Sequence, residues 1–306
     1  MVRLLVAALA LLAAGCASAP PPLTGGGFVQ TRGGDIYVRD WGDASGPPVL
    51  LIHGTTSQLE DWDVALGTEF TSKYRLIAYD RPGMGRSTHR PADAAKLAVQ
   101  GDTAADVIRA EHPGGKVVVV GHSYGGAVAL RLALDHPDLV AGLVLLAPAS
   151  HPWGGGAPFF YKLESAPVIG EIVTTLAWPF SGPAARASLK NRTFAPRPVP
   201  PGYFEKADVK LALRPAALRA TAADFVALPK ELEAQAKRYG ELTMPIEVIQ
   251  GEADRIVPVR LVRQKSAFSH GRVVFVPGAG HMVQHAAQPQ IDEAIGWVLS
   301  EAAKPD

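Results

Sequence analysis

The stretch VVVVGHSYGGAVAL, residues 117–130, places a single serine, Ser123, among glycines between a run of valines and a run of alanines and leucines. The valines predict a buried strand, and the residues after the serine predict a helix. Gly121, Gly125 and Gly126 leave the serine's surroundings free of side chains, because a Cβ there would collide with the neighbouring strand or helix. The stretch therefore predicts a sharp strand-to-helix turn that exposes Ser123.

The pentapeptide G-x-S-x-G at 121–125 is a weak signal by itself, since it also occurs where a serine caps a helix in a glycine-rich turn. Its setting between a strand and a helix is typical of a nucleophile elbow. A serine hydroxyl attacks a carbonyl only when a base takes its proton and a carboxylate orients that base. A nucleophilic Ser123 therefore requires a histidine and an acid elsewhere in the chain.

Short apolar runs recur along the chain with helical patterns between them. The runs cover residues 49–52, 76–79, 117–120, 143–146, 246–249 and 273–276. They show almost no polar alternation, which predicts an α/β fold with a mostly parallel sheet covered on both faces. Residues 28–31 and 36–38 predict an antiparallel hairpin at the sheet edge. Helices are predicted at 61–70, 97–111, 124–135, 259–268 and 291–303.

Candidate acids and bases follow the last two predicted strands. Asp254 lies in one of these loops and His281 in the other, and both can converge on Ser123 because parallel strands end at one edge of a sheet. Glu252 is an alternative acid, and His285 is an alternative base on the same face if a helix has begun.

His281 and His285 could also form a metal pair through the spacing H-x-x-x-H. Met282 stands where the H-E-x-x-H motif has its glutamate, and no third ligand is apparent in the sequence. We therefore expect no metal site.

Acyl transfer also needs donors aimed at the oxyanion that develops on the carbonyl. The backbone N–H of Tyr124, the residue after the serine, is expected to be one donor. The N–H of Thr55, in the His53-Gly54-Thr55 loop after the strand at 49–52, is expected to be the other. His53-Gly54 could equally be an ordinary tight turn.

Together these motifs resemble the serine-type α/β-hydrolase superfamily with a cap. The resemblance runs from about residue 28 to the C-terminus and includes LLIHG at 50–54, DRPGMGRS at 80–87 and the loops at 251–254 and 280–281. It implies Ser123 as nucleophile, His281 as base and Asp254, favoured over Glu252, as acid.

The same resemblance restricts the chemistry. Ser123 in place of an aspartate argues against relatives similar to epoxide hydrolases or haloalkane dehalogenases. Gly83-Met84-Gly85 lacks the third glycine of a dinucleotide fingerprint, so no NAD site and no other cofactor is expected.

Residues 151–240 interrupt the alternation of strands and helices and hold eleven of the chain's 22 aromatic residues. An aromatic insertion at the end of a strand is where a lid over a pocket would lie. We therefore predict a core at 28–150 and 241–306 and a cap at 151–240. The alternative is that the aromatic residues form the insertion's own small core.

The N-terminus has the layout of an export signal. Residues 1–15 contain one cation and an apolar run too short to span a bilayer. The chain's one cysteine, Cys16, follows Ala-Ala-Gly, which resembles a bacterial lipoprotein signal; an accidental cysteine in a plain secretory signal is the alternative. Residues 16–27 are predicted to be a tether. The sequence thus predicts a protein anchored by lipid in the bacterial cell envelope.

The composition is that of an ordinary globular protein. A formal net charge of +1 provides no basic field, so no nucleic-acid partner is expected. The prediction for function is a serine hydrolase that cleaves a small, apolar ester through an acyl-enzyme. A perhydrolase, an amide or lactone hydrolase, and a surface lipoprotein that only binds ligands are the alternatives.

Overall fold

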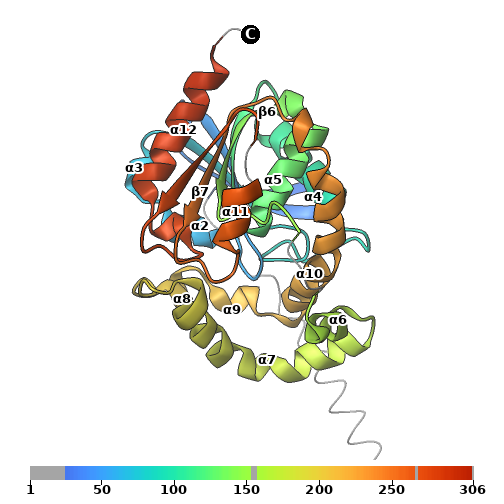
Figure 1. The fold of residues 1–306 in the computed structure, drawn as a ribbon. Coiled ribbons are helices and arrows are strands. Elements are labelled where there is room, and N and C mark those ends of the chain that lie inside the picture. The colour runs from blue at the N-terminus through green and yellow to red at the C-terminus, as the bar shows by residue number, and fades with distance from the viewer. Residues whose placement is uncertain (1–24, 153–156, 266–267, 305–306) are drawn as a thin grey trace, which may run out of the picture.

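The structure, a computed structural model, describes residues 25–152, 157–265 and 268–304 (Figure 1). Its strands are β1 (Gly26–Thr31), β2 (Gly34–Gly42), β3 (Pro48–Ile52), β4 (Arg75–Tyr79), β5 (Val117–His122), β6 (Val140–Leu146), β7 (Ile246–Gly251) and β8 (Gly271–Val276). They form one sheet in the order β1-β2-β4-β3-β5-β6-β7-β8. Only the hairpin strand β2 pairs antiparallel with its neighbours β1 and β4 in the described sheet, which confirms the predicted α/β fold.

The predicted signal and Cys16 lie outside the described residues. The tether was predicted to extend to residue 27, but Gly26 and Gly27 pair with Arg39 and Val38 as part of β1.

Helices cover both faces of the sheet. They are α2 (Glu60–Ala65), α3 (Thr68–Thr71), α4 (Leu97–Glu111), α5 (Tyr124–Asp135), α11 (Val259–Lys265) and α12 (Gln288–Ala302). Helices α4 and α5 pack in the apolar core on one face, and α2, α3 and α12 contribute to the core on the other (Figure 1). The prediction of one helix at 61–70 is wrong, because Leu66 adopts an extended conformation and Gly67 starts a separate helix. Helix α12 begins earlier than predicted, since Pro289 fits its first turn.

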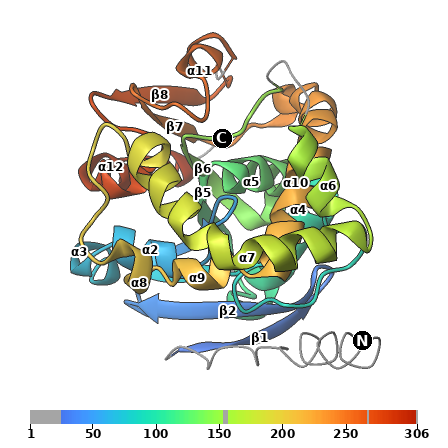
Figure 2. The ribbon, with the colours of Figure 1, turned by 90° about the horizontal axis from the view of Figure 1, so that it is seen from below.

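The segment between β6 and β7 forms a helical layer, which we call the cap. Its helices are α6 (Phe159–Ser165), α7 (Ile169–Ser188), α8 (Tyr203–Lys206), α9 (Val209–Ala212) and α10 (Pro215–Ala236). Helices α6 and α7 pack against α10 and each other. Figure 1 shows the cap below one edge of the sheet. Figure 2, seen from below, shows α7 crossing in front of the other elements.

The cap touches the edge of the sheet where the parallel strands end. The backbone N–H of His281, in the loop after β8, donates to Thr193 O of the cap at 3.0 Å.

Within the described residues, no helix combines the length and the hydropathy needed to cross a bilayer.

Candidate active site

Ser123 occupies a strained turn between β5 and α5. Its φ of 53° and ψ of −115° lie outside the regions that non-glycine residues favour, and its N–H donates to Leu146 O at 2.9 Å. A Cβ on Gly121 would lie 2.5 Å from Gly125 O, and a Cβ on Gly125 would lie 2.1 Å from Ile52 O. Only glycine fits at both positions, so the turn has the geometry of a nucleophile elbow.

Asp254 and His281 meet at the same edge of the sheet. His281 Nδ1 lies 2.9 Å from Asp254 Oδ2, and Asp254 also accepts hydrogen bonds from the N–H groups of Ile256 and Val257. Burial raises the pKa of Asp254, but its hydrogen bond with His281 and the other donors outweigh burial and hold the pKa below its usual value. The carboxylate therefore stays ionised and can orient the imidazole.

His122, the residue before Ser123, contacts His281. The rings of His122 and His281 lie 4.9 Å apart, and His122 Nε2 lies 3.0 Å from His281 O. Burial lowers the pKa of His122 to about 3, so its neutral ring donates the Nε2 proton to that carbonyl. Among the described residues, no hydrogen bond joins Ser123 Oγ to His281. Such a bond often tightens only in the complex with substrate.

The alternative acid and base lie elsewhere. Glu252 is exposed and pairs with Arg263 at 3.3 Å. His285 is buried, and its Nε2 lies 3.0 Å from Asp61 Oδ1. The structure thus brings together Asp254 and His281 and leaves Glu252 and His285 with other partners.

The segments of the two predicted oxyanion donors both border Ser123. Tyr124 follows it at the start of α5, and the Gly54 backbone packs against it, since a Cβ on Gly54 would lie 3.3 Å from Ser123 Cβ. The N–H groups of Thr55 and Tyr124 donate to no acceptor within the described part of the chain. This leaves both N–H groups without a protein acceptor in the described residues, as the predicted role requires.

Comparison with known proteins agrees with this geometry. A family model described as the alpha/beta hydrolase family matches residues 49–292. The chain belongs to this family. A bifunctional esterase/perhydrolase of Acinetobacter calcoaceticus is 29% identical over 276 residues, which cover 83% of this chain and 92% of the relative.

Other members of the alpha/beta hydrolase family resemble part of the chain or its fold. A lipase of Mycobacterium tuberculosis is 39% identical over 38% of this chain and 42% of its own length. An esterase of Thermogutta terrifontis superposes with a TM-score of 0.72 at 23% identity, covering 91% of this chain and 99% of its own. Esterases and lipases among these relatives support ester hydrolysis in general.

Arg81 is a residue of the site that sequence reasoning missed. Its fully buried guanidinium donates to His53 O at 3.2 Å and to Gly54 O at 3.1 Å, and it lies 4.3 Å from the centre of the Tyr124 ring. It forms an ion pair at 2.8 Å with Asp224 on α10 of the cap. Arg81 thus joins the His53-Gly54 loop and Tyr124 of this alpha/beta hydrolase to its cap.

A pattern in the sequence could have indicated Asp224. It is the one charged residue in the helical stretch from 220 to 229, TAADFVALP after Ala220, and a buried charge requires a partner of opposite sign. The partner itself could not be identified, because the pair is separated by 143 residues.

Asp61 forms a second buried network beside the loop of His281. It accepts hydrogen bonds from Tyr203 on the cap at 2.7 Å and from Gln284 at 2.8 Å, and it pairs with His285. Burial raises the pKa of Asp61. The charge and hydrogen bond of His285, together with the other two hydrogen bonds, outweigh burial and hold this pKa below its usual value. This network ties the cap to the segment that follows His281.

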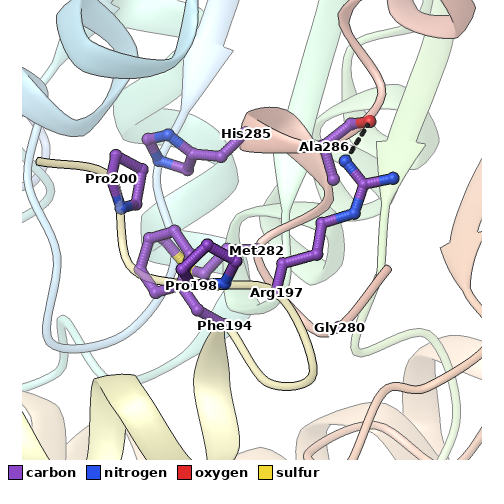
Figure 3. A pocket seen from close by; sticks show the side chains of 8 residues that line it. All are labelled: Phe194, Arg197, Pro198, Pro200, Gly280, Met282, His285 and Ala286. Atoms are coloured by element: carbon purple, nitrogen blue, oxygen red, sulfur yellow. Dashed lines mark hydrogen bonds between the residues drawn. The ribbon is translucent and has the colours of Figure 1, made fainter. Parts of the chain in front are cut away.

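A cavity of about 210 Å³ lies next to this network (Figure 3). It is lined by Phe194, Arg197, Pro198, Pro200, Gly280, Met282, His285 and Ala286. Gly280 and Met282 flank His281, so the cavity borders the loop that carries the predicted base.

Proposed function

We propose that this alpha/beta hydrolase cleaves a carboxylic ester of apolar character through an acyl-enzyme. Ser123 attacks the carbonyl carbon, His281 takes the hydroxyl proton and returns it to the leaving alcohol, and Asp254 orients the imidazole. The N–H groups of Thr55 and Tyr124 stabilise the oxyanion. Water then attacks the acyl-enzyme and releases the acid. The strained Ser123 beside the 2.9 Å contact between His281 and Asp254 is the observation that carries this proposal.

A fluorophosphonate probe tests the nucleophile. The folded protein should be labelled once, and Ser123→Ala should not be labelled. Ser150→Ala is the matched control, because Ser150 is also buried near the end of β6 and should leave labelling unchanged. Equal labelling of Ser123→Ala would contradict the mechanism and favour a ligand-binding lipoprotein.

The preference for apolar esters rests on side chains near His281. One buried apolar cluster joins the cap to the loop after β8. It includes Phe194, Tyr203 and Phe204 of the cap and Met282 of the loop. Each methylene of an acyl chain buried there contributes about 0.8 kcal/mol, so kcat/KM should increase about fourfold per methylene within the reach of the pocket. A series that falls from acetate onward would indicate a small closed pocket.

A perhydrolase is the second candidate, because the relative that matches 83% of this chain is named an esterase/perhydrolase. In that reaction hydrogen peroxide replaces water in attacking the acyl-enzyme and yields a peroxyacid. Peroxyacid formation from acetate and hydrogen peroxide should then depend on Ser123. Ester cleavage without peroxyacid formation would exclude the perhydrolase and leave ester hydrolysis as the one activity.

We also propose that the protein is exported and anchored through acylated Cys16. This proposal rests on the sequence of residues 1–16. Mass spectrometry of the mature N-terminus should find acylated Cys16, and Cys16→Ser should lack the lipid. An unmodified N-terminus downstream of Cys16 would make the protein secreted or periplasmic.

A further inference from the structure

Exposed apolar side chains are concentrated on the cap. Of the ten large apolar side chains exposed in the described residues, eight lie between residues 159 and 180. They are Phe159, Phe160, Val168, Ile169, Ile172, Leu176, Trp178 and Phe180. A concentration of exposed apolar side chains of this kind is typical of a site of interaction with a protein or a membrane. The aromatic residues of the cap therefore divide between a small buried cluster and an exposed one.

Helix α7 carries its large apolar residues on the exposed side. Four of them recur at spacings of three and four and therefore share one face. They are Ile169, Ile172, Leu176 and Phe180, which are 51%, 56%, 69% and 75% exposed. The buried positions of α7 are Gly170 and Thr174, both small. A surface helix of a water-soluble protein has the opposite arrangement, with large apolar residues inside.

Cationic residues flank this apolar face in the sequence, one on α6 and four at or after the end of α7. Residues 157–197 contain five Lys or Arg and two Asp or Glu, a net charge of +3. The five cations are all exposed: Lys162, Arg186, Lys190, Arg192 and Arg197. Within α7, Glu171 is the one charged residue before Arg186. An apolar helix face with cations beside it is complementary to an anionic lipid surface.

We propose that α6 and α7 dock the cap on the surface of a bilayer that contains anionic lipids. The apolar face enters the boundary between headgroups and acyl chains, and Lys162, Lys190 and Arg192 bind lipid phosphates. Arg186 pairs with Glu205, and Arg197 donates to backbone oxygens of the loop around His281. Docking does not depend on ester cleavage.

The chain before β1 is compatible with this orientation. Nine residue steps separate Cys16 from Gly25, and a fully extended segment of that length spans about 30 Å. An acylated Cys16 would thus hold Gly25, next to the start of β1, within about 30 Å of the bilayer that holds the anchor.

Vesicle binding of the mature chain, residues 16–306 with Cys16→Ser and Ser123→Ala, tests the proposal without the apolar signal, an acyl anchor or lipid hydrolysis. Leu176→Ser combined with Phe180→Ser should lower the partition coefficient on phosphatidylcholine–phosphatidylglycerol vesicles about a hundredfold, roughly tenfold per side chain. Phe28→Ser is the matched control: Phe28 is 55% exposed but lies on β1, and its loss should leave binding unchanged. Vesicles of phosphatidylcholine alone should bind on the order of fivefold more weakly for each cation in contact.

A second readout reports on the cap itself. Brominated lipids should quench Trp178, which is 47% exposed, and Trp178→Phe should remove that component of the quenching. Equal partitioning of the double variant and its parent, with no quenching assigned to Trp178, would overturn the proposal. A dimer in sedimentation velocity that Leu176→Ser converts to a monomer would instead assign the face to a second copy.

Discussion

Helices α5 and α7 are similarly apolar, but they occupy opposite environments. Ten of the twelve residues of α5 are buried, whereas Gly170 and Thr174 are the buried residues among the twenty of α7. Helix α5 packs against β5, β6 and α4, and α7 packs against α6 and α10 of the cap. Composition alone therefore does not determine burial, which depends on how many neighbours a helix has.

The difference has a functional counterpart. Burial of α5 on several sides fixes the start of the helix, and with it the N–H of Tyr124 and the position of Ser123, to the precision that catalysis requires. The proposed lipid contact of α7 needs no such precision, because a lipid surface is fluid and accepts apolar side chains in many arrangements. The two proposals thus assign catalysis to the rigid core and membrane contact to the cap.

The largest expected effect lies at the buried edge beside α5. Asp254→Asn should lower kcat about ten-thousand-fold with the fold intact, because a neutral amide favours the imidazole tautomer that cannot accept the serine proton. Glu252→Gln should cost little, since Glu252 contacts Arg263 at the surface. Steady-state kinetics with circular dichroism checks both variants. If Glu252→Gln lost most of its activity while Asp254→Asn kept most of it, Asp254 would not be the catalytic acid.

Replacing His281 should affect kcat, whereas replacing His285 should affect stability. His281→Ala should be as damaging to kcat as Ser123→Ala, because members of one catalytic unit do not act additively. His285→Ala should instead lower the free energy of unfolding, since it leaves the buried carboxylate of Asp61 without one of its hydrogen-bond partners. Denaturant titration separates the second effect from the first.

A charge variant compares the inner and outer sides of the cap. Asp224→Asn leaves Arg81 buried without its ion-pair partner and should cost about 3–5 kcal/mol of unfolding free energy. Glu205→Gln is the control, because Glu205 and Arg186 are 69% and 56% exposed, and such a pair is worth at most about 1 kcal/mol. Similar losses in the two variants would contradict the structural role of Arg81. Urea unfolding measures both.

Truncating one leucine in each helix tests the contrast directly. Leu130 of α5 is fully buried, so Leu130→Ala should cost about 2–5 kcal/mol of unfolding free energy. Leu176 of α7 is 69% exposed, and Leu176→Ala should change stability by no more than about 0.5 kcal/mol. A large loss for Leu176→Ala would mean that α7 is packed against another part of the molecule in solution.

Sequence reasoning succeeded where local chemistry sufficed. The glycines around Ser123 and the apolar runs before it predicted the fold and the strand-to-helix turn, since both depend on neighbours in the chain. It could not find the pairing of Arg81 with Asp224, because that contact depends on how the cap is placed. The exposure of Phe180 was equally inaccessible, since an aromatic residue in a helix is more often buried than exposed.

The smallest expected effect is a pH dependence at the buried edge. His122 has a pKa of about 3 in the folded protein, mainly because of burial, against about 6.5 in the unfolded chain. Below pH 6.5 His122 is protonated in the unfolded chain but stays neutral in the folded protein. The free energy of unfolding therefore falls as the pH decreases from 6.5 towards 3. Between pH 7 and 5.5 this one group should cost about 1 kcal/mol. His122→Gln keeps a donor for His281 O and should reduce the loss by that amount. Leu176→Ala removes no titratable group and should retain the loss seen in the unmodified chain. An unchanged loss in His122→Gln, measured by urea unfolding at both pH values, would mean that His122 is not held neutral.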